Sequence, residues 1–518
     1  LMAQTVAVKG KVTDSGGEPL VAVTVYENGN TSNGTATDSA GNYSISVPSG
    51  ATLVFSCLGF EDVKVIVGKK TDINVTLEED KLTLEASEVV SIGYGSVTRR
   101  DLTGSVSKVD MEDIVKAPVT NFDQALQGRV AGVVVTTSDG ALGAEANITI
   151  RGNNSLTQSS APLYVIDGFQ SESSMATSLN PNDIESIDIL KDASATAIYG
   201  ARGANGVIVI TTKQGVEGKP KVSFSASWAG SSVQNRVEMM DAQEFIDFQT
   251  EFCDYYGLTN FYLRYNDRSE YDGIAGVDWQ DVIYRTAFTQ NYNVSLSGGS
   301  KETGTRYNVS LSATDQDGVI DYSNFQRYQG KINFSQKIGR HVTFDINANY
   351  SRSVTQGSDP KTATSTSSAS GWLMYSVWGY RPVKPLYQLK DGQTMLDAMM
   401  SSMIDDEEGG GSSANDYRFN PAYSIKNEIR KRTVDYLNAN AALRINILPE
   451  LVLRITGGYT LNKQTNEQFN GSQTYTGYEG SPSGRGINGA IHYNTYMNWQ
   501  QENTLTWTKH IRNRHHIE

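Results

Sequence analysis

The stretch NPNDIESIDILKDASATAIYGARGANGVIVITTKQG, which runs from Asn180 to Gly215, has the pattern of a compact unit built from helices and strands. IESIDIL predicts a strand, and Pro181 just before it suits the first position of a short helix. Asp192 is expected to cap the helix ASATAIYG, which Gly200 ends. The residues from Val207 to Ile210 are all apolar, which predicts a strand buried on both faces. The stretch therefore closes a folded domain of mixed α and β structure.

The segment before this stretch belongs to the same domain. TNFDQALQGRVAGVVVTT predicts a helix followed by a strand, with Thr120 as the helix cap and Asp123 three residues later. Phe122 and Leu126 give the helix an apolar face, and Gly128 can end it in the left-handed conformation. The glycines in GARGANG do not have the spacing of a phosphate-binding loop, so we expect them to serve turns and close packing.

From Lys221 onward the chain changes character, because polar and apolar residues alternate over many short segments. NYNVSLSG places Tyr292, Val294 and Leu296 on one face of a strand, and RYNVSLSA, HVTFDINANY and LVLRITGGY repeat the pattern. A soluble β-sandwich gives the same alternation. Segment lengths near the ~9–11 residues that cross a bilayer, and 27 tyrosines that can supply interfacial girdles, favour a transmembrane β-barrel.

Bulk composition excludes several classes of function. The net charge of -13 over 518 residues, with no basic stripe, argues against nucleic acid as a partner. No run reaches the ~18 apolar residues of a membrane helix, while a mean hydropathy of -0.39 suits a barrel, whose strands expose only alternate residues to lipid. We find no nucleophile–base pair, metal cluster or cofactor motif, so we predict neither an enzyme nor a bound cofactor. The opening residues LMAQ resemble the end of a secretory signal.

Residues 5–79 form a separate β-rich region. Short β-branched runs such as VAVKGKVTD, VAVTVYENG and ATLVFSCLGF are divided by turn signals, which predicts a small β-sandwich. In TDSAGNYSI, Asp38 is expected to cap a turn, and Tyr43 and Ile45 to enter the core.

A linker, residues 80–98, follows the sandwich. It has too few apolar residues for a core of its own, but the run from Glu88 to Ile92 is β-prone. That run is either part of an ordinary linker or a peptide that another protein captures as an added strand.

Four segments carry a resemblance to a known family: DLTGSVSKV, ALQGRVAGVVVTTSDGALGAEANITIRGNNSL, PLYVIDGF and the stretch from Asn180 to Gly215. Together they resemble the SusC/RagA-type TonB-dependent transporters of the bacterial outer membrane. The resemblance implies a plug domain at residues 99–215 and a barrel at residues 220–518. Residues 5–79 resemble the carboxypeptidase regulatory-like domain, a transthyretin-like sandwich. The expected fold is thus an all-β sandwich, then an α+β plug, then an antiparallel transmembrane β-barrel.

We expect that barrel to be incomplete. We count about eight alternating segments, and a barrel of eight strands has an interior that side chains fill, whereas plugged outer-membrane barrels have about 22 strands. The final residues, RNRHHIE, lack the aromatic strand of a finished barrel. The sequence therefore predicts a truncated chain or fragment that stops partway round the wall, or a wall that a partner segment completes.

The resemblance also implies partners and a location. The family's TonB box falls on SEVVSIGYG, which assigns it to Glu88, Val89, Val90, Ser91 and Ile92, although Ser91 and Ile92 depart from the usual valine run. The implied partners are TonB, a SusD-like surface lipoprotein, outer-membrane lipid and an imported oligosaccharide or peptide. The implied location is the outer membrane of a Gram-negative bacterium. A secreted adhesin made of several β-domains is the alternative, and insertion of a barrel into the membrane would decide between the two.

Two long insertions interrupt the strand pattern. Residues 236–288 have partly helical periodicity, and residues 354–430 are rich in Ser, Gly and Asp. Four aromatic residues of the second insertion can stack on sugar rings or pack in a loop core: Trp372, Tyr375, Trp378 and Tyr380. In TDQDGVID, Asp315, Asp317 and Asp321 have a spacing similar to that of a calcium loop, but the terminal Glu is missing, so a hairpin turn is the preferred interpretation.

Overall fold

The computed structural model of the chain divides into two compact units. One comprises Leu1–Val106 with Asp192–Tyr199, and the other comprises Ser107–Lys191 with Gly200–Glu518. The structure describes residues 5–14, 16–28, 30–57, 60, 62–68, 71–78, 89–92, 95–98, 106–109, 111, 114, 121–136, 142–143, 146–152, 159–171, 179–357, 373–403, 419–479, 486–511 and 515–517.

The N-terminal region is a β-sandwich with its own core. Side chains from a three-stranded and a four-stranded sheet meet between the two layers. In sheet order the strands are β4 (Asn42–Pro48), β1 (Thr5–Asp14) and β7 (Val75–Leu77), then β3 (Asn30–Ala36), β2 (Thr24–Glu27), β5 (Thr52–Ser56) and β6 (Val63–Ile66). Tyr43 and Ile45 are buried in this core, as predicted. The Asp38 carboxylate accepts hydrogen bonds from the backbone N–H groups of Ala40 and Asn42, which confirms the predicted turn.

The αβ domain predicted from the stretch Asn180–Gly215 is built on a five-stranded sheet. In sheet order its strands are β10 (Val106–Val109), β15 (Ile184–Leu190), β16 (Val207–Thr212), β13 (Leu163–Ile166) and β14 (Phe169–Ser171). A separate hairpin pairs β11 (Val133–Thr136) with β12 (Asn147–Ile150). Strand β16 is central, parallel to β13 and antiparallel to β15. Its residues Val207–Ile210 are buried, as their unbroken apolar run predicts.

The short helices of this region begin where the sequence predicts, but two of their caps differ. Helix α3 (Phe122–Ala125) starts after Asn121 and not after Thr120, which lies outside the described residues. Asn121 makes no side-chain cap hydrogen bond, because its Oδ1 accepts a hydrogen bond from Arg327.

The prediction for Asp192 is also only half right. This residue precedes helix α5 (Ala193–Thr196), but its side chain makes no cap hydrogen bond. Helix η2 (Pro181–Asp183) has the predicted cap, since Asn180 Oδ1 accepts from the backbone N–H of Asn182. Gly200, in η3 (Ala197–Gly203), has φ 59° and interrupts the helical conformation.

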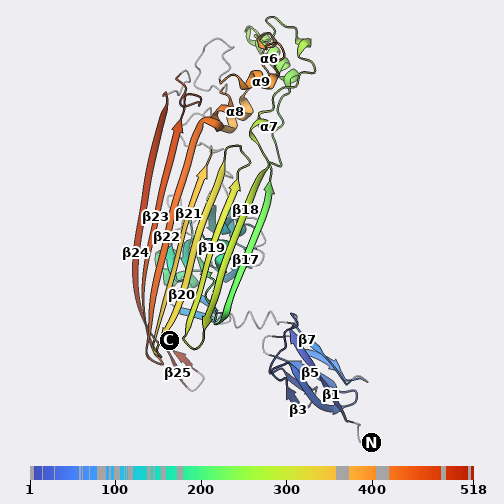
Figure 1. Cartoon of the computed structure of the whole chain (residues 1–518), viewed down its shortest axis with the longest axis vertical. Coiled ribbons are helices and arrows are strands. Elements are labelled where there is room, and N and C mark those ends of the chain that lie inside the picture. Colours follow the sequence, from blue (N-terminus) through green and yellow to red (C-terminus); the bar gives the residue numbers. More distant parts are fainter. Residues whose placement is uncertain are drawn as a thin grey trace. The chain divides into compact units, whose positions relative to one another are not determined.

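Eight strands of the C-terminal region form one antiparallel sheet in chain order, which confirms the expected strand count, and β25 (Lys509–Ile511) pairs separately with β26 (His515–Ile517) (Figure 1). The eight strands are β17 (Gly218–Ser231), β18 (Ala287–Ser300), β19 (Thr305–Asp317), β20 (Asn324–Ile338), β21 (Val342–Gln356), β22 (Glu428–Leu448), β23 (Leu451–Asn470) and β24 (Asn488–Trp507). Their lengths of 13 to 21 residues exceed the ~9–11 needed to cross a bilayer. Among the described residues, β17 and β24 are edge strands that do not pair with each other, so the barrel is partial.

The two faces of this sheet differ in polarity: apolar residues point outward and polar residues point inward. On β18, Tyr292, Val294 and Leu296 are exposed, whereas Asn293 between them is buried. On β20, four alternate residues are polar and buried: Arg327, Gln329, Lys331 and Asn333. A soluble sandwich buries its apolar face and exposes its polar one. The outward apolar face therefore favours a barrel wall that contacts lipid, rather than the alternative of a soluble sandwich.

A helical loop region lies beyond the strand ends at one end of the sheet (Figure 1). Its helices are α6 (Ala242–Tyr256), η4 (Arg268–Tyr271), α7 (Trp279–Ile283), α8 (Leu373–Gly379), η6 (Leu386–Gln388), α9 (Met395–Met400) and α10 (Pro421–Asn427). This confirms the helical periodicity of residues 236–288. The region has its own hydrophobic core, in which Tyr271 and Trp279 are fully buried. Within the described part of the chain, no helix has both the length and the apolar character required to cross a membrane.

Candidate functional site

Strand β20 holds the plug domain through its buried polar residues. Arg327 Nη1 donates to Asn121 Oδ1 at 3.2 Å, and Lys331 Nζ donates to the Asp183 carbonyl oxygen at 3.3 Å. Asn333 Nδ2 donates to the Lys213 carbonyl oxygen at 2.6 Å. We call these side chains and their plug partners the polar seam: Arg327, Lys331 and Asn333 with Asn121, Asp183, Thr212 and Lys213. Because the three wall residues are two or four positions apart, the period of a β-strand places them all on its inner face.

A buried carboxylate lies beside the seam and bonds to one of its members. Asp167 follows β13 with φ 49°, and its carboxylate accepts hydrogen bonds from Thr212 N at 2.8 Å and Thr212 Oγ1 at 2.6 Å. Burial raises the pKa of the Asp167 carboxyl, while the positive charge of Lys331 and the hydrogen bonds from Thr212 oppose that rise. The charged form of Asp167 is therefore stabilised by Lys331 of the barrel wall.

Asp167 and Lys331 line a small cavity between the plug and the wall, with a volume of about 20 Å³. Three buried amide atoms of its lining have no hydrogen-bond partner in the described structure: Asn333 Oδ1, Asn349 Nδ2 and Asn438 Oδ1. A polar cavity larger than ~10–15 Å³ has room for a water molecule. At this cavity the contact between plug and wall is therefore suited to hydration, unlike a dry hydrophobic core.

Glycine allows the backbone of the wall to approach the plug closely at another strand. A Cβ atom on Gly458 of β23 would lie 3.1 Å from Cδ1 of Phe169 and 2.9 Å from Asn440 Oδ1. The neighbouring Gly457 would meet no atom within 4 Å. Only one residue of this glycine pair is therefore required by packing against the plug.

The run predicted to bind TonB forms a strand in part. Val89–Ile92 is β8, which pairs antiparallel with β9 (Gly95–Thr98), while Glu88 lies outside the described residues. The pair is a two-stranded sheet, so within the described residues the other edge of β8 has no strand partner. An unpaired edge of this kind is the structural requirement for strand addition.

The four aromatic loop residues divide between the surface and the core. Tyr375 and Trp378 on α8 are partly exposed, and Trp372 lies outside the described residues. Tyr380 is only 3% exposed and packs edge-on against Trp279, with ring centroids 4.9 Å apart. This burial does not fit the predicted ligand contact for Tyr380 and agrees with the loop-core interpretation.

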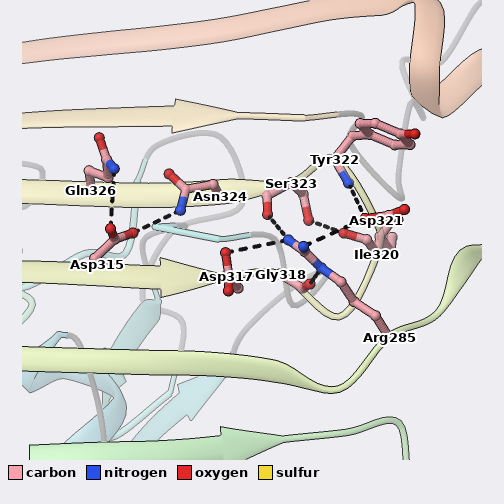
Figure 2. Close-up of polar contacts among 10 residues, drawn as sticks. All are labelled: Arg285, Asp315, Asp317, Gly318, Ile320, Asp321, Tyr322, Ser323, Asn324 and Gln326. Atoms are coloured by element: carbon pink, nitrogen blue, oxygen red, sulfur yellow. Dashed lines mark hydrogen bonds and ion pairs between the residues drawn. The ribbon is translucent and has the colours of Figure 1, made fainter.

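The aspartate-rich segment forms the end of β19 and the turn into β20: Asp315 and Asp317 pair with Gln326 and Asn324 of β20, and Asp321 lies in the turn (Figure 2). Arg285 provides the positive charge there, since its guanidinium lies 3.5 Å from carboxylate oxygens of both Asp317 and Asp321. Asp315 lies apart from Arg285 and accepts a hydrogen bond from Asn324 at 2.8 Å (Figure 2). The carboxylates of this segment thus pair with protein groups, Asp317 and Asp321 with Arg285 and Asp315 with Asn324.

Together these features define a class of protein, in which a plug domain is held against the inner face of an outer-membrane barrel wall. Residues 98–207 match the family model of the TonB-dependent Receptor Plug Domain, and residues 8–91 match that of the CarboxypepD_reg-like domain.

Similar proteins cover nearly the whole chain. It is 34% identical over 520 residues to TonB-dependent receptor SusC of Bacteroides thetaiotaomicron, a match that covers 96% of this chain and 49% of that protein. It is 34% identical over 510 residues to TonB-dependent receptor P3 of Formosa agariphila, covering 98% of this chain and 46% of that protein. The solved structure of the RagAB peptide importer in the 'open-open' state aligns with a TM-score of 0.65 at 28% identity, over 83% of this chain and 48% of that one.

The chain thus carries the plug domain of TonB-dependent receptors and is similar along nearly its whole length to receptors of the SusC/RagA type. It spans about half the length of the curated relatives that it matches.

Sequence reasoning missed the residues that join the plug to the wall. Asp167, Lys331 and Gly458 each occupy an ordinary position in a turn or an alternating strand. Lys331 itself was the one indication in the sequence, because a lysine on the buried face of a strand almost always has a partner.

Proposed function

We propose that the whole protein imports an oligosaccharide across the outer membrane in a step driven by TonB. Substrate binds at the face that carries the helical loops. TonB then pairs with β8 and pulls, the plug shifts from the wall, and the ligand passes to the periplasm. No covalent bond is made or broken in this cycle.

The polar seam is the observation that carries this proposal. Each hydrogen bond between plug and wall contributes only about 0.5–1.5 kcal/mol net, because water replaces the partner when the two separate. A plug held in this way is stable at rest and can still be displaced by a mechanical pull. A continuous apolar contact would expose hydrophobic surface on displacement and resist the same force.

The choice of substrate rests on the loop aromatics. Tyr375 and Trp378 are partly exposed on α8, where their rings can stack on a sugar. A peptide is the second candidate, because the RagAB structure similar to this chain is that of a peptide importer. Replacing Trp378 with Ala should weaken oligosaccharide binding and leave peptide binding unchanged if the sugar assignment is right. We also propose that a SusD-like surface lipoprotein covers the loop face during binding.

Deleting Glu88–Ile92 tests the pulling step. The deletion removes β8, so substrate should still bind at the cell surface while its uptake into the periplasm is lost. Labelled oligosaccharide supplied to whole cells measures both quantities in one experiment. A matched deletion of residues 81–85 in the same linker should keep both. Normal uptake by the Glu88–Ile92 deletion would show that TonB pulls elsewhere.

A further inference from the structure

Helix α6 of the loop region buries one of its sides. Ala242, Ile246 and Cys253 are buried in the loop core. Asp241 and Glu244 form a capping box at its start, and Gly257 with φ 64° ends it. The helix is therefore fixed in position by its caps and its buried side, and its remaining surface is presented as a rigid platform.

An aromatic ridge runs along the exposed part of α6. We define the α6 ridge as four side chains that are each at least 41% exposed: Phe248, Phe252, Tyr255 and Tyr256. The rings contact one another in sequence, with centroid distances of 6.1 Å from Phe248 to Phe252, 4.8 Å to Tyr256 and 4.9 Å on to Tyr255. They thus form one continuous surface.

The ridge is large enough to matter for binding. At roughly 200 Å² per aromatic side chain, these exposures leave an apolar patch on the order of 400–500 Å², within the range of the largest patches of typical monomers, which are often functional. A stable protein interface buries about 800 Å² per partner. The ridge would therefore supply about half of one side of such an interface.

Acidic residues line one flank of the ridge. Glu244, Asp247, Glu251 and Asp254 recur at intervals of three and four residues, which places them on one side of the helix. Asp247 is neutralised by Arg268, whose Nε lies 2.5 Å from its Oδ1. Glu251 and Asp254 are exposed to solvent. A complementary surface needs an apolar pocket for the rings and basic residues beside it.

The aromatic ridge and its acidic flank together narrow down which partner can bind there. A second copy of the chain would bring two acidic flanks together if the ridges met, and like charges in close contact are unfavourable. A lipid headgroup layer rich in phosphate is disfavoured for the same reason. The ridge lies beyond the strand ends, at the end of the sheet that also carries α7, α8 and α9 (Figure 1). That is the face which the proposed function assigns to the surface lipoprotein.

We propose that the α6 ridge is the docking surface for an apolar, basic-edged face of the SusD-like surface lipoprotein. The proposal rests on the proposed function for the existence of that partner. The rings act as anchors in the partner's pocket, and the acidic flank sets its orientation and speeds its approach.

Binding of the purified lipoprotein to the full-length protein in nanodiscs tests the proposal. The double variant Phe252→Ser/Tyr256→Ser should raise the dissociation constant at least 30-fold. Both side chains are exposed, so their truncation should leave folding intact. The control Tyr265→Ser removes an equally exposed ring of the same loop region, outside the ridge, and should change the constant less than twofold.

A charge variant provides a second, independent measurement. Glu251→Lys/Asp254→Lys should slow association about tenfold at low salt, with the difference disappearing near 0.5 M salt, because screening removes electrostatic steering. This variant keeps every ring of the ridge.

The outcomes separate failure of the ridge from failure of the proposed function. If the wild type binds the lipoprotein and the ridge variant binds it equally well, the ridge is not the docking surface, although the importer model survives. If the ridge variant alters only self-association of the receptor, seen by mass photometry, the occupant is a second copy and the proposal is overturned. If the wild type does not bind the lipoprotein at all, the proposed partner is itself refuted.

Discussion

Lys331 shows how the role of one residue depends on what faces it. In the sequence it is one polar position of an alternating strand. In the structure it is 3% exposed, donates to the Asp183 carbonyl oxygen and lines a cavity with Asp167. The period of a strand places Lys331 on the same face as Arg327 and Asn333, but it does not reveal the plug residue opposite, because Asp183 lies more than a hundred positions earlier in the chain.

Replacing Lys331 with Met should loosen the plug. The variant keeps the length of the side chain but removes its donor and leaves the Asp167 carboxylate without a facing cation, which should weaken the seam by about 1–3 kcal/mol. In planar bilayers, the full-length variant should open to a conducting channel at a lower urea concentration than the wild type. Lys337→Met, at the exposed end of the same strand, serves as the control. Equal urea dependence of the two variants would argue against a role for Lys331.

Tyr43 predicts an alkaline limit to the stability of the sandwich. Its hydroxyl donates to the Ile73 carbonyl oxygen at 2.8 Å, and burial, assisted by the charge of Asp72, raises its pKa from 10.0 to about 12. A raised pKa means that the native state keeps the proton longer than the unfolded state. The stabilisation is complete below pH 10 and is lost as the pH rises towards 12.

Urea unfolding of the sandwich domain, residues 5–79, across this pH range measures the effect. Its core is drawn entirely from its own residues, which supports expressing it alone. Tyr43→Phe should cost about 1 kcal/mol at pH 7 through the lost hydrogen bond, and should abolish the decline associated with ionisation of this hydroxyl. An unchanged decline in the Phe variant would assign it to other groups.

For helices and strands, the hydrophobic periodicity of the sequence predicted which elements exist and in what order. It did not predict which side chains contact one another across elements. The alternating segments predicted the eight strands of the sheet, and the run Val207–Ile210 predicted the central strand of the plug. The caps predicted at Thr120 and Asp192 were less successful, since helix α3 begins after Asn121, whose side chain bonds to Arg327 of the wall, and Asp192 makes no side-chain cap hydrogen bond. Local signals fail where a distant strand competes for the same polar atom.

The glycine pair of β23 offers a matched test of how closely the wall approaches the plug. Gly458→Val should force the Phe169 ring and the wall apart and destabilise the docked plug by about 1–3 kcal/mol. Gly457→Val adds the same side chain on the open face, where no atom lies within 4 Å, and should be tolerated. Limited proteolysis of the full-length protein, followed at the plug, compares the two. Similar protease resistance would contradict close packing at this strand.

For the whole molecule, the sequence predicted the order of the domains. It did not predict the contacts that hold the plug against the wall. Turn signals, the unbroken apolar strand and the alternating tail predicted the sandwich, the plug and the incomplete barrel in sequence. The decision between a soluble sandwich and a membrane wall required the structure, because only burial shows that Asn293 faces inward while Tyr292 and Val294 face outward. The identity of the imported ligand depends on loop side chains whose arrangement no periodic pattern encodes.

A reversible cross-link between plug and wall tests the central claim most directly. Thr212 of the plug and Asn333 of β20 have side-chain atoms 3.4 Å apart, so Thr212→Cys/Asn333→Cys, in a background without Cys57 and Cys253, should form a disulfide in the full-length protein in its membrane. A protease site introduced after Gly257 reveals the bond, since the two fragments stay joined only when it is present. We predict that oxidised cells bind substrate but do not import it, and that reduction restores import. Failure of the disulfide to form, or unchanged import while it is intact, would contradict a plug that is held by this wall and released from it.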